Sequence, residues 1–415
     1  MRKFWCLPYL AAWLAACTTV SAPPPPQPTL APPKVEVATA TAPAAGTPTE
    51  IAPTAAPTLP PDTPPPAATA TPSVLNPLTG LPLADASVLE RRPLAIKVAH
   101  FPRSVREHQV GLSFADNVWE HYAEGGVIRF TGIFYSQTPE KVGNVRSARL
   151  IDGLIADAYQ ALLVASGSST GTMSRLRENE DLYPRIIAEY TGYSECPLLC
   201  REEDASLTTN KLFTSPAALW QLAEEKQFGP PQNFAGYPFA AGTPASGTPI
   251  TTIHLDWQLN NTVAEWRYDA ASGQYTRWVD TANLPELAPH VDTLTGQQLS
   301  ASNIVWLVAP YVPSNIREEE GGQFFFSYDV LLTGEGEARV FRDGVMIEGK
   351  WLRSEAAHSL PQLVDANGNI IPLKPGVTWF AVYSLNSPMN IDTAQGIFQA
   401  RFRAPDPRPA VTPTP

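Results

Sequence analysis

A long stretch of low sequence complexity limits how much of this chain can fold. Residues 18–72 consist mostly of Pro, Ala, Thr and Val, with few charges and no aromatic residue. Such a segment buries too little apolar surface to offset the conformational entropy that folding costs. We therefore expect a disordered tether with polyproline II character, and a folded part that begins only after it.

The segment before the tether has the pattern of an export signal. Arg2 and Lys3 precede an apolar run at 4–16, which is too short to span a membrane comfortably as a helix. The run ends in Leu-Ala-Ala-Cys, which matches the bacterial lipobox, although an ordinary signal peptide with an incidental cysteine is an alternative. We expect residues 1–16 to be removed and Cys17 to carry lipid. The protein would then be anchored to the cell membrane on its extracytoplasmic side.

The other two cysteines of the exported chain, Cys196 and Cys200, lie four residues apart. In an exported protein this pair favours a local disulfide, and the spacing can meet the required Cα separation on a helical turn. Two reduced thiols or a metal pair are the alternatives. The histidines are scattered without a metal-binding spacing, so we expect no metal site, and we expect no cofactor.

The net charge of the chain argues against one class of partner. A formal charge of -11 does not suit a general nucleic-acid binder, which needs a basic face to replace condensed counterions. A local arginine pocket for a small anion remains compatible with an acidic chain.

The hydrophobic patterns predict an α+β fold in two regions. In the first, at 75–215, strand patterns at 93–100, 127–135 and 161–165 alternate with helix patterns that begin near Leu150 and Met173. We also expect a helix over 113–125, because Ser113 and Asp116 resemble a capping box and Gly125-Gly126 can end it. Alternation of this kind favours an α/β layer structure with some parallel strand pairing.

The second region, at 251–403, has short β-type runs instead. Asp343-Gly344 and Asn367-Gly368 are hairpin signals, and tryptophans at strand spacing are expected in the core. We expect a mainly antiparallel β region there. The linker would then cover 17–74, a connecting segment 216–250, and a disordered tail 404–415.

Several long motifs resemble the DUF3048 family, the YerB-like bacterial lipoproteins. In the first region these are "NPLTGLPL", "RPLAIKV", "LSFADNVWEHYAEGGVIRFTGIF" and "PEKVGNVRSAR"; in the second they are "HVDTLTGQQLSASNIVWL", "GEGEARVFRDGVMIEGKW" and "DANGNIIPLKPGVTWF". The resemblance implies an extracytoplasmic lipoprotein with two subregions. It implies no settled activity.

Arginines gather where strand and helix patterns meet in the first region. Arg129, Arg146 and Arg149 present guanidinium groups that suit phosphate or carboxylate, and a helix N-terminus nearby adds N–H donors. One interpretation is a pocket for an anionic ligand, completed by the Ser168, Ser169 and Thr170 loop. The other is internal ion pairing with nearby carboxylates, for which Asp116, Glu120, Glu124, Glu140 and Asp152 are available.

The same loop offers an alternative reading as an enzyme. Residues 167–171 fit the pattern G-x-S-x-G between a strand and a helix, which would make Ser169 a nucleophile with His254, His290 or His358 as base. A plain helix N-cap is the simpler interpretation of Ser169. The acidic run Glu318–Glu320 is expected to be a solvated loop.

We interpret the folded part as a binding module more than as an enzyme. Its partner would be an anionic cell-envelope component, a cell-wall or envelope glycan, or an envelope protein. The alternative is a hydrolase or transferase that acts on envelope polymers through Ser169.

Overall fold

A computed structural model describes residues 74–202, 211–257, 262–320, 323–356 and 358–405, which form one compact unit. The predicted signal peptide, the predicted lipidation site Cys17, nearly all of the predicted linker 17–74 and most of the predicted tail 404–415 lie outside the described residues. Within the described ranges, we find no helix whose length and apolarity would let it cross a bilayer.

The larger of two main sheets runs through both predicted regions. Its strands lie in the order β22 (Gln362–Val364), β21 (Val345–Arg353), β20 (Gly334–Arg342), β17 (Asn303–Ala309), β23 (Thr378–Ser384), β2 (Asn117–Tyr122), β3 (Ile128–Phe134), β1 (Leu94–Ala99), β5 (Leu162–Val164) and β6 (Ile186–Ile187), with β9 (Thr248–Pro249) against β21. The two predicted regions of the chain meet in this sheet, where β2 of the first region pairs in parallel with β23 of the second. The β1–β5 and β5–β6 pairs are also parallel, as the alternating pattern predicts.

The second main sheet is mostly antiparallel and comes from the later part of the chain. Its order is β13 (Leu287–Pro289), β12 (Gln274–Asp280), β11 (Val263–Asp269), β10 (Thr252–Asp256), β25 (Ile397–Arg401) and β24 (Met389–Asp392), with β16 (Ser300–Ala301) against β12. Smaller sheets pair β14 (Val291–Asp292) with β15 (Gln297–Gln298), β18 (Tyr311–Glu320) with β19 (Gln323–Val330), and β8 (Leu212–Thr214) with β4 (Val142–Gly143) and β7 (Cys200–Arg201).

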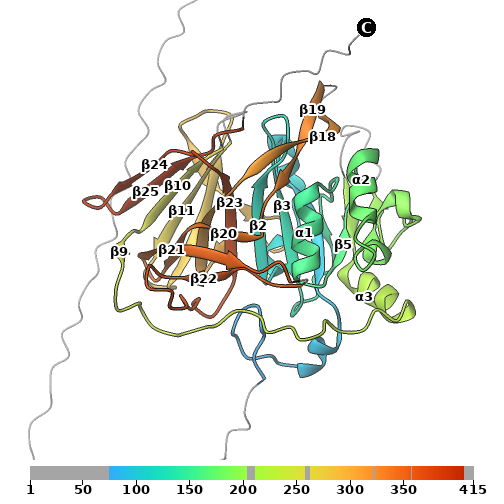
Figure 1. Cartoon of the computed structure of the whole chain (residues 1–415), viewed down its shortest axis with the longest axis horizontal. Helices are drawn as coiled ribbons and strands as arrows, with labels where there is room; N and C mark the ends of the chain where they lie inside the picture. The colour runs from blue at the N-terminus through green and yellow to red at the C-terminus, as the bar shows by residue number, and fades with distance from the viewer. Residues whose placement is uncertain (1–73, 203–210, 258–261, 321–322, 357, 406–415) are drawn as a thin grey trace, which may run out of the picture. The chain divides into compact units, whose positions relative to one another are not determined.

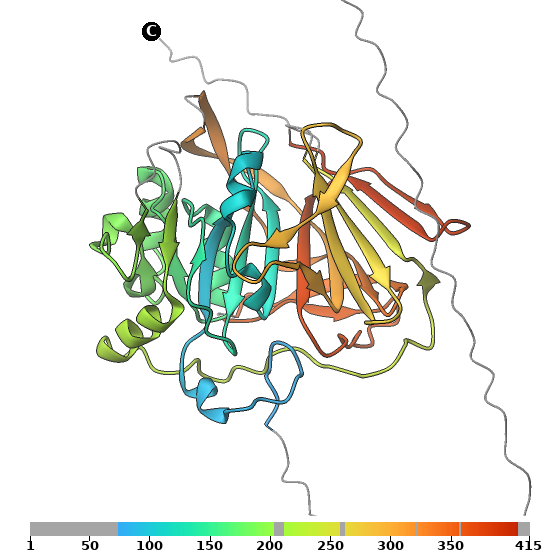
Figure 2. The ribbon, with the colours of Figure 1, turned by 180° about the vertical axis from the view of Figure 1, so that it is seen from behind.

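Helices and the second sheet cover opposite faces of the larger sheet. Within the described residues the α-helices are α1 (Leu150–Ala158), α2 (Thr170–Arg177) and α3 (Pro216–Glu225). Figure 1 shows α1 lying across the sheet near β2 and β3, with α2 and α3 beside β5. Figure 2 shows the opposite side, where the second sheet lies toward the viewer. The fold is therefore α+β, as predicted, with a helical layer on one face and a β layer on the other.

The two main sheets are joined by polar pairs as well as by apolar packing. Glu120 on β2 points toward the second sheet and accepts two hydrogen bonds from Arg277 on β12, at 2.7 and 2.9 Å. Trp379 on β23 donates to the same carboxylate at 2.7 Å. Arg277 and Glu120 are completely buried, so this ion pair fixes how the second sheet sits on the first.

The hydrophobic core contains the tryptophans that the strand spacing places there. Trp257, Trp266, Trp306, Trp351 and Trp379 are each at most 1% exposed, as predicted. The Asp343-Gly344 hairpin also forms, between β20 and β21. Cys196 and Cys200 lie at disulfide distance, with Cα atoms 4.6 Å apart.

The helix predicted over 113–125 is wrong, because residues 117–122 form strand β2. Ser113 does not cap a helix; its N–H and hydroxyl bond to Asp292. Apolar residues spaced four apart satisfy a strand as well as a helix, since four is a multiple of the two-residue strand period. β2 lies in the middle of the sheet and is buried on both faces, so no polar face marks it as a strand.

Candidate functional site

The two motifs predicted to bind a ligand lie side by side at the carboxyl end of β5. The Ser166 N–H donates to the Arg146 carbonyl at 3.0 Å, and the Ala148 N–H donates to the Gly167 carbonyl at 2.8 Å. The hydroxyls of Ser147 and Ser166 are 3.3 Å apart. In open α/β sheets, ligands commonly bind at the carboxyl ends of parallel strands. Residues 146–149 and 166–170 therefore form one continuous element at the end of β5.

A carboxylate from the second region lies at the centre of this element. Glu318 on β18 accepts hydrogen bonds from the Ser169 hydroxyl at 2.8 Å and the Thr172 hydroxyl at 2.6 Å. Its other oxygen is 3.8 Å from the Arg149 guanidinium. Two of the predicted ligand residues thus converge on an anion, and that anion belongs to the protein itself. Glu318 is 3% exposed, so the prediction of a solvated loop at Glu318–Glu320 is wrong for Glu318.

Arg149 is held on its other side by a second carboxylate. Its Nε donates to Glu124 at 2.5 Å, and its Nη2 contacts the same oxygen. Arg129 on β3 donates to the Ser147 carbonyl at 3.2 Å and lies near enough to Glu124 to interact electrostatically. Burial alone would raise the pKa of Glu124, but Arg149 and Arg129 hold it below its ordinary value.

A third carboxylate connects this network to the sheet below α1. Asp152 accepts from Lys97 at 2.8 Å and from Thr131 at 2.5 Å, and the Arg149 N–H caps α1 by donating to it at 2.6 Å. Lys97 also lies 2.7 Å from the His121 ring. Burial lowers the pKa of Lys97 to about 8. Burial would raise the pKa of Asp152, yet Lys97 and His121 hold it well below its ordinary value, so the pair stays charged.

The network is buried and balanced in formal charge. Three cations (Lys97, Arg129 and Arg149) face three carboxylates (Glu124, Asp152 and Glu318), and none is more than 4% exposed. Burial also lowers the pKa of His121, which keeps the ring neutral. Arg149 therefore takes part in internal ion pairing, one of the two alternatives that the sequence left open, and Arg129 acts electrostatically on the same carboxylate, Glu124. Ligand binding at Arg146, Ser168 and Thr170 stays a prediction.

The structure gives Ser169 the role of a helix N-cap. Its oxygen accepts from the Thr172 N–H at 3.1 Å while its hydroxyl donates to Glu318. The three histidines considered as bases bond elsewhere: His254 to Glu265, His290 to Arg277 and Gln109, and His358 to Asp157. This arrangement does not favour a nucleophilic serine.

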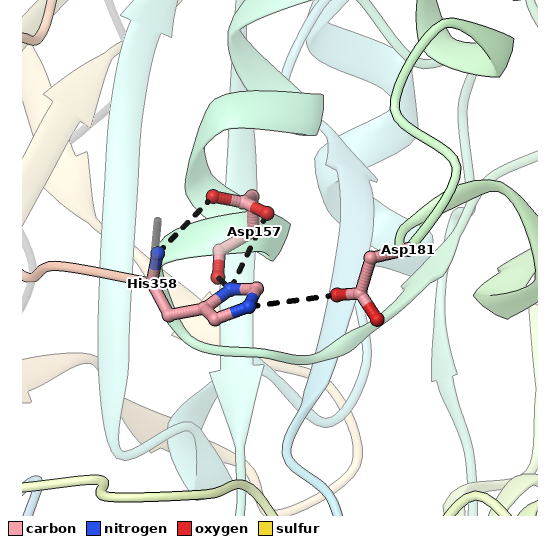
Figure 3. Close-up of side chains that lie close together, drawn as sticks. All are labelled: Asp157, Asp181 and His358. Carbon is pink, nitrogen blue, oxygen red and sulfur yellow. Dashed lines mark hydrogen bonds and ion pairs between the residues drawn. The ribbon is translucent and has the colours of Figure 1, made fainter. Parts of the chain in front are cut away.

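A separate cluster near the end of α1 has the residue types of a metal site (Figure 3). His358 Nδ1 is 3.2 Å from the Asp157 carbonyl, and its Nε2 is 3.7 Å from the Asp181 carboxylate. The ligand atoms of these three residues lie within 4.8 Å of one another. However, Arg185 bonds to Asp181, and Arg353 lies 3.9 Å from Asp157. Two guanidinium groups already balance the two carboxylates, so the donor set fits an ion-pair cluster better than a divalent cation.

Sequence reasoning missed several members of the buried network. Lys97, His121 and Thr131 come from β-strands whose apolar neighbours gave no sign of a polar layer, and Glu318 comes from the other half of the chain. Glu124 and Asp152 were among the carboxylates considered for pairing with the arginines. Glu124 pairs with Arg149 in this way, whereas Asp152 pairs with Lys97.

Comparisons with known proteins agree with the motifs. Residues 78–229 match the "Protein of unknown function (DUF3048) N-terminal domain", and residues 253–380 match the corresponding C-terminal domain. The chain is 28% identical to "Putative lipoprotein YerB" of Bacillus subtilis (strain 168) over 331 residues, which cover 77% of this chain and 89% of that protein. The crystal structure of Bacillus subtilis YerB is similar with a TM-score of 0.61, over 74% of this chain and 96% of that one. With both domain matches and a relative that shares most of its length, this chain belongs to the DUF3048 family.

Proposed function

We propose that this protein is a lipid-anchored binding module that recognises an anionic component of the cell envelope. Lipid at Cys17 would hold it on the extracytoplasmic side of the cell membrane, and the linker would carry the folded unit away from the bilayer. The binding site is formed by Arg149, Ser169 and Thr172, a set defined here as the anion site.

One observation carries the proposal: three donors from two chain segments converge on a single carboxylate. Two hydroxyls contact one oxygen of Glu318, and a guanidinium faces the other. Hydrogen bonds to a charged acceptor are stronger than neutral ones, and Arg is well suited to carboxylates and phosphates. Ser169 and Thr172 belong to the first turn of α2, where the helix dipole adds positive potential.

The test is a calorimetric titration of the full mature chain with Cys17→Ser, which removes the lipid. The probes are N-acetylmuramic acid, which carries a carboxylate, its neutral counterpart N-acetylglucosamine, and glycerol 3-phosphate. Glu318→Ala opens the site, and the exposed neighbour Glu319→Ala is the matched control. We expect Glu318→Ala to bind one or both anionic probes and not the neutral sugar.

A second pair of variants locates the binding. In the Glu318→Ala background, Thr172→Val keeps the side-chain shape and removes one donor, so the affinity for the anion should fall about tenfold. Thr333→Val, at an exposed position, should leave it unchanged. Equal binding of the charged and neutral sugars, or equal effects of the two threonine variants, would contradict the proposal.

A further inference from the structure

We infer that the hairpin of β18 and β19, here termed the arm, is a lid over the anion site and that Glu318 competes with the ligand for it. This inference rests on the proposed function and adds a ligand class and a means of regulation. Glu318 is an internal carboxylate in the position that an external anion would occupy. The site therefore suits ligands that bear a carboxylate of similar size.

The arm forms a structural unit of its own. Its two strands pair with each other and form a sheet of their own, apart from the two main sheets. The strand register shifts between Pro313 and Arg317, which marks an irregular point between the base of the arm and Glu318. Figure 1 shows the arm rising beyond the ends of the sheet strands beside α1 and α2.

The base of the arm is firmly attached and β19 packs against α1, whereas the contacts of β18 with α2 are few. At the base, the Tyr311 hydroxyl donates to the Val382 carbonyl at 2.9 Å, and Tyr311 packs with Tyr122 and Tyr328. Toward α2, the described contacts include Glu318 itself, Ile316 over Gly171, and an ion pair between Asp329 and Arg175 at 3.2 Å. Arg175 is 47% exposed, so solvent weakens that last pair.

Competition follows from this geometry. A ligand can reach the hydroxyls of Ser169 and Thr172 only when Glu318 has left them, so its apparent affinity is reduced by the fraction of molecules with an open arm. Removing the Glu318 carboxylate removes the competitor. We expect Glu318→Ala to bind the anionic probe tenfold more tightly than the parent chain, or better still.

A disulfide between the arm and α2 provides the test of movement. A Cβ placed on Gly171 would lie 3.3 Å from the Cβ of Ile316, close to the separation of about 3.8 Å that disulfides prefer. Gly171→Cys with Ile316→Cys, in the full mature chain with Cys17→Ser, should therefore lock the arm closed on oxidation. Gly171→Ser with Ile316→Ser is the matched pair that cannot be locked.

The titration with N-acetylmuramic acid is repeated on the oxidised cysteine pair and on the serine pair. We expect the serine pair to bind and the oxidised pair to lose binding at least tenfold, with recovery when the cross-link is reduced. The parent chain treated with the same reductant controls for loss of the native Cys196–Cys200 disulfide. Equal affinities of the oxidised cysteine pair and the serine pair would overturn the lid and leave the proposed function intact. Absence of binding by Glu318→Ala would overturn both.

Discussion

Acidification from pH 7.5 to 5.5 should lower the free energy of unfolding by about 3 kcal/mol, because two buried histidines take up protons only after unfolding. His100 and His290 lie together between β3 and the second sheet, with ring centroids 5.2 Å apart. Burial lowers the pKa of both rings well below the ordinary value of 6.5, and Arg106 and Arg277 lower it further. Both rings are therefore neutral in the folded state.

The magnitude follows from linkage. A histidine that stays neutral in the folded state contributes stability that is fully present above pH 6.5 and is lost as the pH falls below it. At pH 5.5 the loss is about 1.4 kcal/mol for each ring, so the two rings together give about 3 kcal/mol. His121 acts in the same direction, since burial and Lys97 lower its pKa as well. Asp116 acts in the opposite direction, because burial raises its pKa.

The assay is urea denaturation followed by tryptophan fluorescence at pH 7.5, 6.5 and 5.5. His100→Phe is the informative variant, because among the described residues neither nitrogen of His100 has a hydrogen-bond partner. The variant keeps the ring and removes one titrating group, so its loss of stability on acidification should be smaller by about 1.4 kcal/mol. The reasoning is refuted if the chain is equally stable at pH 7.5 and 5.5, or if His100→Phe keeps the full pH dependence.

Three further results are expected. Arg277→Met should destabilise the fold by about 3–5 kcal/mol in urea denaturation, because it leaves the Glu120 carboxylate buried without its cation; a loss below 1 kcal/mol would contradict the role of this pair. Replacing Cys196 and Cys200 by serine should cost about 2 kcal/mol in the same assay, since the bridge closes only a short loop, and an unchanged midpoint would argue against a bridge in solution. Cys17→Ser should move the protein from the membrane fraction to the soluble fraction on cell fractionation; retention in the membrane would refute lipid anchoring at that residue.

Local patterns in the sequence were sufficient for much of the fold. The strands around Ile96, Phe130 and Leu163 and the helix that begins at Leu150 form as predicted, because each strand is a short, mostly apolar run between turn residues and the helix has apolar residues at helical spacing. The helix prediction for the region of β2 is wrong for a physical reason. It is a central strand whose polar residues pair with partners on both faces, and such a strand lacks the alternation that identifies an edge or surface strand.

The candidate site shows more clearly that local sequence patterns do not reveal contacts between distant parts of the chain. Arg149 and Ser169 could be selected from the sequence because their motifs place donors at helix starts. Glu318, the carboxylate they share, lies about 150 residues further along the chain. No local pattern connects it to them, because the contact depends on how the arm folds back over α2. A long-range ion pair of this kind becomes visible only in three dimensions.

The central claim is that Arg149, Ser169 and Thr172 form an anion site that Glu318 fills from within. A crystal structure of the Glu318→Ala chain grown with acetate tests it most directly. We predict an acetate ion whose oxygens lie within about 3 Å of the Ser169 and Thr172 hydroxyls. A site that holds only water at high acetate concentration, with the arm still closed over α2, would contradict the claim.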